Sequence, residues 1–202
     1  MILCDIGNTS YHFLDGERDY KESVADFDPS IVTKRVYYIS VNSSVKERLQ
    51  ELKNWIDLEQ FIDRSRYYSS MGIDRVVALE GIENAVVVDA GSAITIDVVR
   101  DGIFEGGFIY PGVQAMSKSY SSISPALEYP FNFDLDLKKL PKNSQDAISY
   151  GFLKLLYSEV SAYNLPIILT GGDALAFKKL FTEAKVDKLL LFESMKKLII
   201  KL

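Results

Sequence analysis

The chain has 202 residues, of which 48% are hydrophobic and 25% are charged, and its formal net charge is −5. This length allows one large domain or two small ones, and the composition is that of an ordinary globular protein. The acidic balance argues against a general surface for nucleic acid or for anionic membranes. We therefore expect no nucleic acid and no membrane among its partners.

The chain contains one cysteine, Cys4, and one histidine, His12. A single cysteine excludes an intrachain disulfide and a cysteine-based zinc cluster, and we expect Cys4 to be a buried core residue. Ser-His-Asp and Cys-His mechanisms are difficult to build from so few residues. Asp5 interrupts the apolar start of the sequence at once, so we expect no signal peptide and a cytoplasmic protein.

In chain order, residues 2–40 predict four strands, at 2–4, 11–14, 20–24 and 36–41. Asp15-Gly16 is a turn signal between the second and third strands. Ser43 and Ser44 are good helix caps, and apolar spacing predicts a helix over 45–56. This order differs from the uniform βα alternation of a Rossmann fold. Neither the Rossmann nor the P-loop glycine motif occurs, which disfavours a Rossmann dehydrogenase and a P-loop kinase.

Gly72-Ile73-Asp74-Arg75 follows a polar, aromatic stretch and opens a predicted helix that extends to Gly81. An aspartate at a helix start is commonly only a cap. The alternative is a proton acceptor beside an arginine that binds a carboxylate. The sequence pattern leaves both interpretations open.

Residues 86–99 predict a β-branched strand, the turn Asp89-Ala90-Gly91-Ser92, and a returning strand of alternating character. The stretch around Asp5-Ile6-Gly7 has the same design, and each copy is followed by an Asp-Gly turn. This repetition predicts a duplicated hairpin domain. A carboxylate, an exposed glycine backbone and the hydroxyls of Ser92 and Thr95 suit a bound phosphate and its cation.

The remainder of the chain predicts a strand over 102–112 and a helix through Met116, followed by a lid-like or connecting segment over 117–142. A long amphipathic helix over 147–163 is capped by residues 143–146. A buried strand at 166–170 then ends in Gly171-Gly172-Asp173, and a helix runs towards Phe181. Residues 189–202 predict an edge strand or turn and a terminal helix with solvated lysines.

Five motifs, in this order, resemble the type III pantothenate kinase family of the acetate and sugar kinase, heat-shock chaperone and actin superfamily. They are Asp5-x-Gly7-Asn8-Thr9, Gly72-x-Asp74-Arg75, Asp89-Ala90-Gly91-Ser92-Ala93-x-Thr95-x-Asp97, Gly106-Gly107-x-x-x-Pro111-Gly112 and Thr170-Gly171-Gly172. The resemblance implies an α/β fold of two ribonuclease-H-like (actin-like ATPase) domains, residues 1–82 and 83–202. Mixed sheets flanked by helices would enclose an active-site cleft. The implied activity is ATP-dependent phosphorylation of pantothenate to 4′-phosphopantothenate, the first step of coenzyme A biosynthesis, by a homodimer.

The resemblance also implies roles for individual residues. Asp74 would be the proton acceptor. Pantothenate would be contacted by Tyr67, Tyr68, Gly72, Ile73, Asp74, Arg75 and Ser144. ATP would be contacted by Asp5, Ile6, Gly7, Asn8, Thr9, Ser10, Tyr11, His12 and Ser92. Asp89 would bind a monovalent cation, K⁺ or NH₄⁺. Asp5 would bind Mg²⁺ by way of the ATP phosphates.

Two departures from the family pattern stand out. The first is Gly91-Ser92-Ala93 in place of Gly-Thr-Ala, which keeps a hydroxyl at the middle position. The second is Tyr67-Tyr68-Ser69-Ser70-Met71 in place of a segment with Tyr and Asn-Pro, which leaves two candidates for the tyrosine that covers the substrate. The alternatives are another small-molecule kinase, for a sugar or acyl substrate, and an inactive nucleotide-binding regulator. The first gives no reason for Gly-x-Asp-Arg, and the presence of Asp5, Asp74 and Asp89 speaks against the second.

Overall fold

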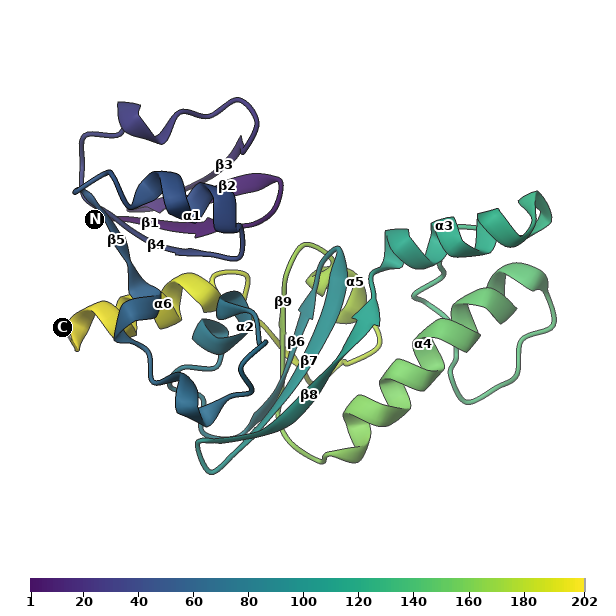
Figure 1. Cartoon of the computed structure of the whole chain (residues 1–202). Helices are drawn as coiled ribbons and strands as arrows, with labels where there is room; N and C mark the ends of the chain where they lie inside the picture. The colour runs from purple at the N-terminus through teal and green to yellow at the C-terminus, as the bar shows by residue number, and fades with distance from the viewer. Residues whose placement is uncertain (202) are drawn as a thin grey trace. The chain divides into compact units, whose positions relative to one another are not determined.

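The structure is a computed structural model that describes residues 1–201, and it divides into two compact units (Figure 1). The first unit contains Met1–Gly81 and the segment from Leu189 onward, and the second contains Ile82–Lys188. Each unit has one mixed five-stranded sheet, in the orders β3-β2-β1-β4-β5 and β8-β7-β6-β9-β10. In both, the central strand pairs antiparallel with the next strand of its hairpin and parallel with a later strand. The predicted duplication of the hairpin and the expected mixed sheets are confirmed.

The first unit is an α/β sheet with helices on both faces. Its strands are β1 (Ile2–Ile6), β2 (Ser10–Asp15), β3 (Arg18–Ser23), β4 (Val36–Ser40) and β5 (Trp55–Asp57). Its helices are α1 (Ser43–Leu49), α2 (Ile73–Ala78) and α6 (Leu190–Ile200), with 3-10 turns η1 (Pro29–Ile31), η2 (Leu58–Phe61) and η3 (Arg64–Arg66). Because side chains alternate along a strand, β1 presents Cys4 and Ile6 to the core under α1 and the opposite face to α6.

Cys4 is fully buried, and this burial raises the pKa of its thiol well above the ordinary value. The prediction that this cysteine is a core residue is therefore confirmed.

The helix predicted over 45–56 is wrong in its second half. α1 ends at Leu49, and Trp55 and Ile56 belong to strand β5, where Trp55 pairs with Val36. Trp55 is 5% exposed, and its Nε1 donates to the carbonyl of Pro29 at 3.3 Å, so burial at the sheet edge decides its conformation. The cap of α1 is Asn42, whose Oδ1 accepts from the amide of Val45, and not Ser43 or Ser44.

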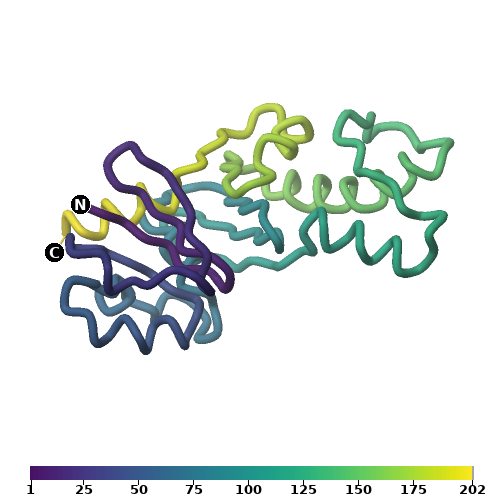
Figure 2. Tube along the Cα trace, turned by 90° about the horizontal axis from the view of Figure 1, so that it is seen from above, coloured from purple at the N-terminus to yellow at the C-terminus, as the bar shows by residue number. Residues whose placement is uncertain are grey.

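The compact units differ from the expected domain limits, 1–82 and 83–202, in the C-terminal segment. Helix α6 packs on β1, α2 and η2 of the first unit. Figure 2 shows the yellow C-terminal helix beside the purple N-terminal strand. Its buried side chains, among them Phe192 and Met195, cover the face of the first sheet opposite α1. The chain therefore returns to the first unit to complete its core.

The second unit repeats the arrangement with longer helices. Its strands are β6 (Ala85–Ala90), β7 (Ala93–Arg100), β8 (Ile103–Pro111), β9 (Ile167–Thr170) and β10 (Lys185–Val186). Its helices are α3 (Val113–Ile123), α4 (Ser144–Ala162) and α5 (Ala174–Phe177), with the 3-10 turn η4 (Pro125–Leu127). Phe152 and Leu156 of α4 and Phe177 of α5 pack on the apolar face of β6 and β7.

One expectation for the second unit is confirmed and one is corrected. The long helix α4 begins after Asn143, whose Oδ1 accepts from the amide of Asp146, as expected. Strand β8 is irregular near Gly106, which has φ +145 and lies opposite a shift in the pairing register between Val98 and Val99 of β7. The helix expected to end at Met116 continues to Ile123, so the first part of the supposed connecting segment is helical. Residues 117–123 contain no proline or glycine to stop the helix.

Candidate functional site

In the first unit the candidate ATP loop joins β1 to β2. Asp5 is the penultimate residue of β1, and its paired neighbours are His12 on β2 and Ile39 on β4. The amide of Gly7 donates to the carbonyl of Ser10 at 3.0 Å, which closes the turn, and Asn8 and Thr9 are exposed at its tip. The turn therefore presents main-chain groups and short polar side chains, as a phosphate-binding loop requires.

Tyr11 and His12 occupy the returning strand, and their side chains have structural partners. Tyr11 is completely buried among aromatic rings, including Phe13 and Phe27. His12 Nε2 lies 2.6 Å from Oδ1 of Asp19, and its ring packs on Phe192. Contacts of these two residues with ATP would therefore come from the main chain. Ile6 is also fully buried.

The Gly-x-Asp-Arg motif lies at the same edge of the first sheet as the Asp5 loop. The amide of Val41, just after β4, donates to the carbonyl of Ile6 at 3.1 Å. A Cβ added at Gly72 would lie 3.9 Å from Cγ1 of Val41 and would overlap Oδ1 of Asp74. The start of α2 thus lies beside the ends of β1 and β4, and the absence of a side chain at Gly72 leaves room for the Asp74 carboxylate. Oδ1 of Asp74 accepts from the amide of Arg75 at 2.8 Å.

Arg75 and Ile73 are buried residues of α2, with exposures of 7% and 4%. The Nη1 atom of Arg75 donates to the hydroxyl of Tyr68 at 2.5 Å, and its guanidinium lies 5.7 Å from the centre of that ring. Tyr67 instead donates its hydroxyl to Oε1 of Glu80 at 3.3 Å. These contacts connect Tyr68 to the arginine of the motif and Tyr67 to Glu80.

In the second unit, polar side chains gather where β6 and β9 end. Asp89 is paired in register with Thr95 on β7 and with Thr170 on β9. Residues paired in this way place their side chains on the same face of a sheet. That face lies opposite the one covered by Phe152 and α4. Asp89 is half-buried and Thr170 is 7% exposed, so this cluster is sheltered from water.

Two glycines let neighbouring loops close on this cluster. A Cβ at Gly171, which has φ +86, would overlap Oδ1 of Asp89 and the carbonyl oxygen of Ala90. A Cβ at Gly112, just before α3, would overlap the carbonyl oxygens of Gly91 and Ser92. Both glycines therefore lie directly against the turn from Asp89 to Ser92. Sequence reasoning did not assign Gly112 or Gly171 to the site, although both belong to its motifs.

Ser144 is the first residue of α4 and is exposed. The cap around it consists of Asn143 and Asp146, which bond to each other, and Asp146 also accepts from Nδ2 of Asn132 at 2.9 Å. These side-chain hydrogen bonds, from Asn132 and then Asn143, lower the pKa of the Asp146 carboxyl. The structure thus places Ser144 in the first turn of α4, directly after this cap.

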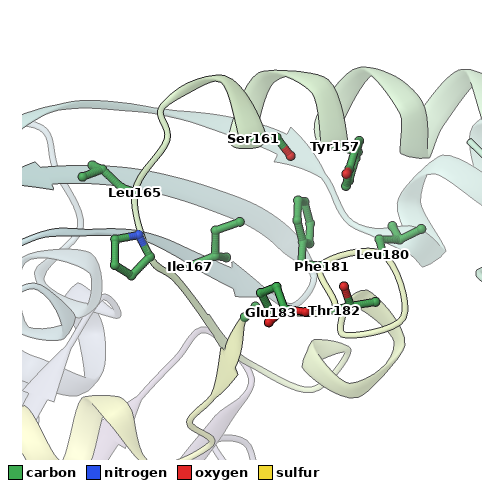
Figure 3. A pocket seen from close by; sticks show the side chains of 10 residues that line it. Tyr157, Ser161, Leu165, Ile167, Leu180, Phe181, Thr182 and Glu183 are labelled. Atoms are coloured by element: carbon green, nitrogen blue, oxygen red, sulfur yellow. The ribbon is translucent and has the colours of Figure 1, made fainter. Parts of the chain in front are cut away.

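A separate hollow of the second unit, of about 230 Å³, lies at the opposite end of β9 from Thr170 (Figure 3). Its walls are the end of α4, the start of β9 and the segment before β10. The rings of Tyr157 and Phe181 stack there with centroids 5.5 Å apart, and Leu165 and Ile167 complete the apolar lining. The hollow contains none of the predicted site residues.

Within residues 1–201, no group of three or more His, Cys, Asp or Glu side chains could hold a metal ion. No helix in that range is long and apolar enough to cross a membrane.

Comparisons with known proteins agree in one family. The sequence profile of the family described as type III pantothenate kinase matches residues 28–164. A protein of that name from Sulfurimonas denitrificans is 62% identical over 97% of this chain and 96% of its own length. Another, from Campylobacter jejuni, is 42% identical over 98% of this chain and 96% of its own.

Solved structures give the same fold. A conserved Campylobacter jejuni protein ascribed to the Baf family of transcriptional activators superposes with a TM-score of 0.90 at 40% identity, covering 100% of this chain and 98% of its own. A protein from Sinorhizobium meliloti, described as a 2-dehydro-3-deoxygalactonokinase, shares only 10% identity but has a TM-score of 0.59, over 100% of this chain and 96% of its own. The second likeness concerns the fold alone.

Proposed function

Because the chain belongs to the type III pantothenate kinase family, we propose that it transfers the γ-phosphoryl group of ATP to pantothenate with Asp74 as proton acceptor. The product is 4′-phosphopantothenate, and the reaction is the first step of coenzyme A biosynthesis. The observation that carries the proposal is the placement of Gly72 and Asp74 beside the ends of β1 and β4, at the edge where the Asp5 loop begins.

The proposed step is an in-line displacement. The pantothenate hydroxyl oxygen attacks the γ-phosphorus, its proton passes to the carboxylate of Asp74, and the bond to the β,γ-bridging oxygen breaks to release ADP. Phosphoryl transfer depends on positioning and charge neutralisation more than on covalent chemistry. Such a reaction needs neither a histidine nor a cysteine nucleophile, which suits a chain with one residue of each type.

Arg75 is proposed to bind the carboxylate of pantothenate. A guanidinium suits a planar carboxylate, and its burial increases the strength of the ion pair. Tyr68, bonded to Arg75, is proposed as the tyrosine that covers the substrate. Gly72 and Ile73 would support this pocket through the main chain. Tyr67 and Ser144 remain proposed contacts on the family resemblance alone.

ATP is proposed to bind along the turn from Asp5 to His12 and at Ser92. Asn8 and Thr9, exposed at the tip of the turn, offer amides for the phosphates, and Ser10 adds a hydroxyl. Ser92 is an exposed residue of the corresponding turn in the second unit.

The donors present fit the cations that the family implies. Asp89 contributes one carboxylate, and the carbonyl oxygens of Gly91 and Ser92 face Gly112 nearby. Such hard oxygen donors with a single charge suit a monovalent ion, K⁺ or NH₄⁺. Asp5 supplies a single carboxylate, which suits Mg²⁺ that is bound mainly through nucleotide phosphates. When bound, the cations neutralise charge on the transferring phosphoryl group.

We also propose a homodimer in the cytoplasm. The dimer rests on the family resemblance, and exposed apolar side chains such as Ile109 of β8 and Leu155 of α4 are compatible with it. The cytoplasmic location rests on the consumption of ATP. Light scattering of the purified protein gives the mass of the assembly, and a monomer would contradict the dimer.

A coupled assay of ADP release tests the reaction. The purified protein, with ATP, Mg²⁺ and K⁺, is supplied with pantothenate in one arm and with a panel of sugars in the other. We expect ADP release that depends on pantothenate. Release that depends on a sugar would favour another kinase of this fold, and no release with any acceptor would favour a regulator without turnover.

A further inference from the structure

The segment that leads into α2 carries a contact that the proposed mechanism does not use. Nη2 of Arg64, in η3, donates to the main-chain carbonyl of Met71 at 2.5 Å. Met71 is 2% exposed, and its amide donates to the carbonyl of Tyr68 at 3.0 Å. Met71 directly precedes Gly72, so the Arg64 bond acts on the last peptide before the Gly-x-Asp-Arg motif.

The guanidinium of Arg64 is held from its other side by Glu59 of η2. Nη1 donates to Oε1 of Glu59 at 2.6 Å, and Oε2 of the same carboxylate accepts from Lys46 of α1. Lys46 also pairs with Asp57 at 2.9 Å. Burial opposes the charge on Glu59, but the bonds from Lys46 and Arg64 outweigh it and lower the pKa of the carboxyl. The Glu59 carboxylate that binds Arg64 is therefore held in turn by Lys46 of α1, which also pairs with Asp57 of β5.

Helix α2 packs on α6 and β4 through buried side chains, and the contacts upstream of Gly72 add a fixed point at its first turn. It has six residues, and its N-cap, Gly72, forms no side-chain capping bond. The Asp74 carboxylate bonds to the amide of Arg75, within its own first turn, and so does not tie the helix to another element through this bond. Fixing the carbonyl of Met71 fixes the point at which the first turn of α2 begins.

We propose that Arg64 is a positioning residue, which holds Asp74 in place by joining the Glu59 carboxylate to the Met71 carbonyl. The inference rests on the proposed role of Asp74. Arginine suits this position because its planar guanidinium presents several donors in a fixed fork. The single ammonium of lysine, on a flexible stem, can pair with Glu59 but does not hold both acceptors in one geometry.

Steady-state kinetics of Arg64→Lys in the full chain test this role. We expect kcat to fall about tenfold, since a small displacement of a reacting group is costly, while KM for ATP stays within about twofold of the wild type. The matched control is Arg100→Lys, because Arg100 of β7 pairs with Glu105 at 3.0 Å in the other unit. The control should retain the wild-type kcat. A kcat of Arg64→Lys within about twofold of the wild type, after correction for the folded fraction, would overturn the proposal.

Hydrogen exchange supplies a readout that does not depend on catalysis. The amides of Val76 and Leu79 donate within α2, at 3.1 and 3.3 Å, and should exchange about tenfold faster in Arg64→Lys than in the wild type or in Arg100→Lys. Amides of β1 should not change. Unchanged exchange in α2 would overturn the proposal. If the wild type does not phosphorylate pantothenate, the proposed function is contradicted. Faster exchange of the α2 amides in Arg64→Lys would still support the positioning role of Arg64 in that case.

If Arg64→Lys does not fold, Glu59→Gln applies the same test. Glutamine keeps the shape of the side chain and can still accept from Arg64, but it removes the charge that anchors the guanidinium. We expect a smaller change than for Arg64→Lys, in the same direction, in both kcat and the exchange of α2. An effect on melting temperature alone, with kcat and α2 exchange unchanged, would contradict positioning through this bond.

Discussion

Gly171 touches Asp89 so closely that a Cβ atom on the glycine would overlap Oδ1 of the carboxylate and the carbonyl oxygen of Ala90. Gly171 also has φ +86, a conformation that residues with a side chain rarely adopt. The turn after β9 can therefore close over the Asp89 carboxylate only with glycine at this position. This relationship joins two motifs that are far apart in the sequence.

Gly171→Ala should destabilise the protein by about 2 kcal/mol or more, because both the backbone conformation and the space for a side chain are unfavourable. Gly172→Ala is the matched control. A Cβ at Gly172 meets nothing within 4 Å, so its effect should stay within about 0.5 kcal/mol. Chemical denaturation measures both. Equal stability of the two variants would contradict the close approach to Asp89.

Asp89→Asn should remove the activation of the kinase by K⁺. The amide keeps the shape of the side chain but lacks the charge that attracts a monovalent cation. The measurement is the rate of ADP release as K⁺ replaces a bulky organic cation at constant ionic strength. A variant whose rate still rises with K⁺ as in the wild type would show that Asp89 is not the ligand.

Tyr11→Phe should leave the free energy of unfolding unchanged or raise it by up to about 1 kcal/mol. Within the described residues, the buried hydroxyl of Tyr11 has no hydrogen-bond partner, so its removal abolishes a desolvation cost. Tyr110→Phe provides the contrast, because the Tyr110 hydroxyl donates to the carbonyl of Phe152 at 3.3 Å. That variant should lose about 1 kcal/mol. A loss of similar size for Tyr11→Phe would indicate a partner for its hydroxyl.

The Glu59 carboxylate should make stability depend on acidic pH. Its pKa in the folded protein lies below the ordinary value of 4.5, although burial opposes the shift, because Lys46 and Arg64 favour the charged form. The contribution to stability is thus complete above that ordinary value and is lost as pH falls through the folded-state pKa. Melting temperatures of the wild type and Glu59→Gln should differ at about pH 7 and converge near about pH 3. A difference in melting temperature that stays the same at both pH values would contradict a lowered pKa of Glu59 in the folded protein.

Much of the fold could be predicted from the sequence because local signals agree with the tertiary structure. The two Asp-x-Gly hairpins, with Asp15-Gly16 and Asp101-Gly102 after them, specify the antiparallel half of each sheet. The cap at Asn143 and the apolar stripe that follows specify α4. The resemblance of ordered motifs to type III pantothenate kinases is confirmed by the family match.

Sequence-based prediction fails where contacts between residues distant in the sequence determine the local structure. The apolar spacing of residues 45–56 fits a helix, yet Trp55 gains more from pairing with Val36 and burial at the sheet edge. The segment from Leu189 onward follows the second unit in the sequence, but its helix α6 packs on β1 of the first unit. The hydrogen bond between the Tyr68 hydroxyl and Arg75 is likewise a contact that no local pattern encodes. The same holds for the bond from Arg64 to Met71.

The most direct test of the account is the turnover of Asp74→Asn with saturating ATP and pantothenate, measured beside ATP binding of the same protein. Asp101→Asn is the control, because Asp101 has φ 52 in an exposed turn, where asparagine is well tolerated. If Asp74 accepts the proton, kcat falls by roughly 10²–10⁴ while ATP affinity stays that of the wild type. Turnover close to that of the control would contradict the central claim.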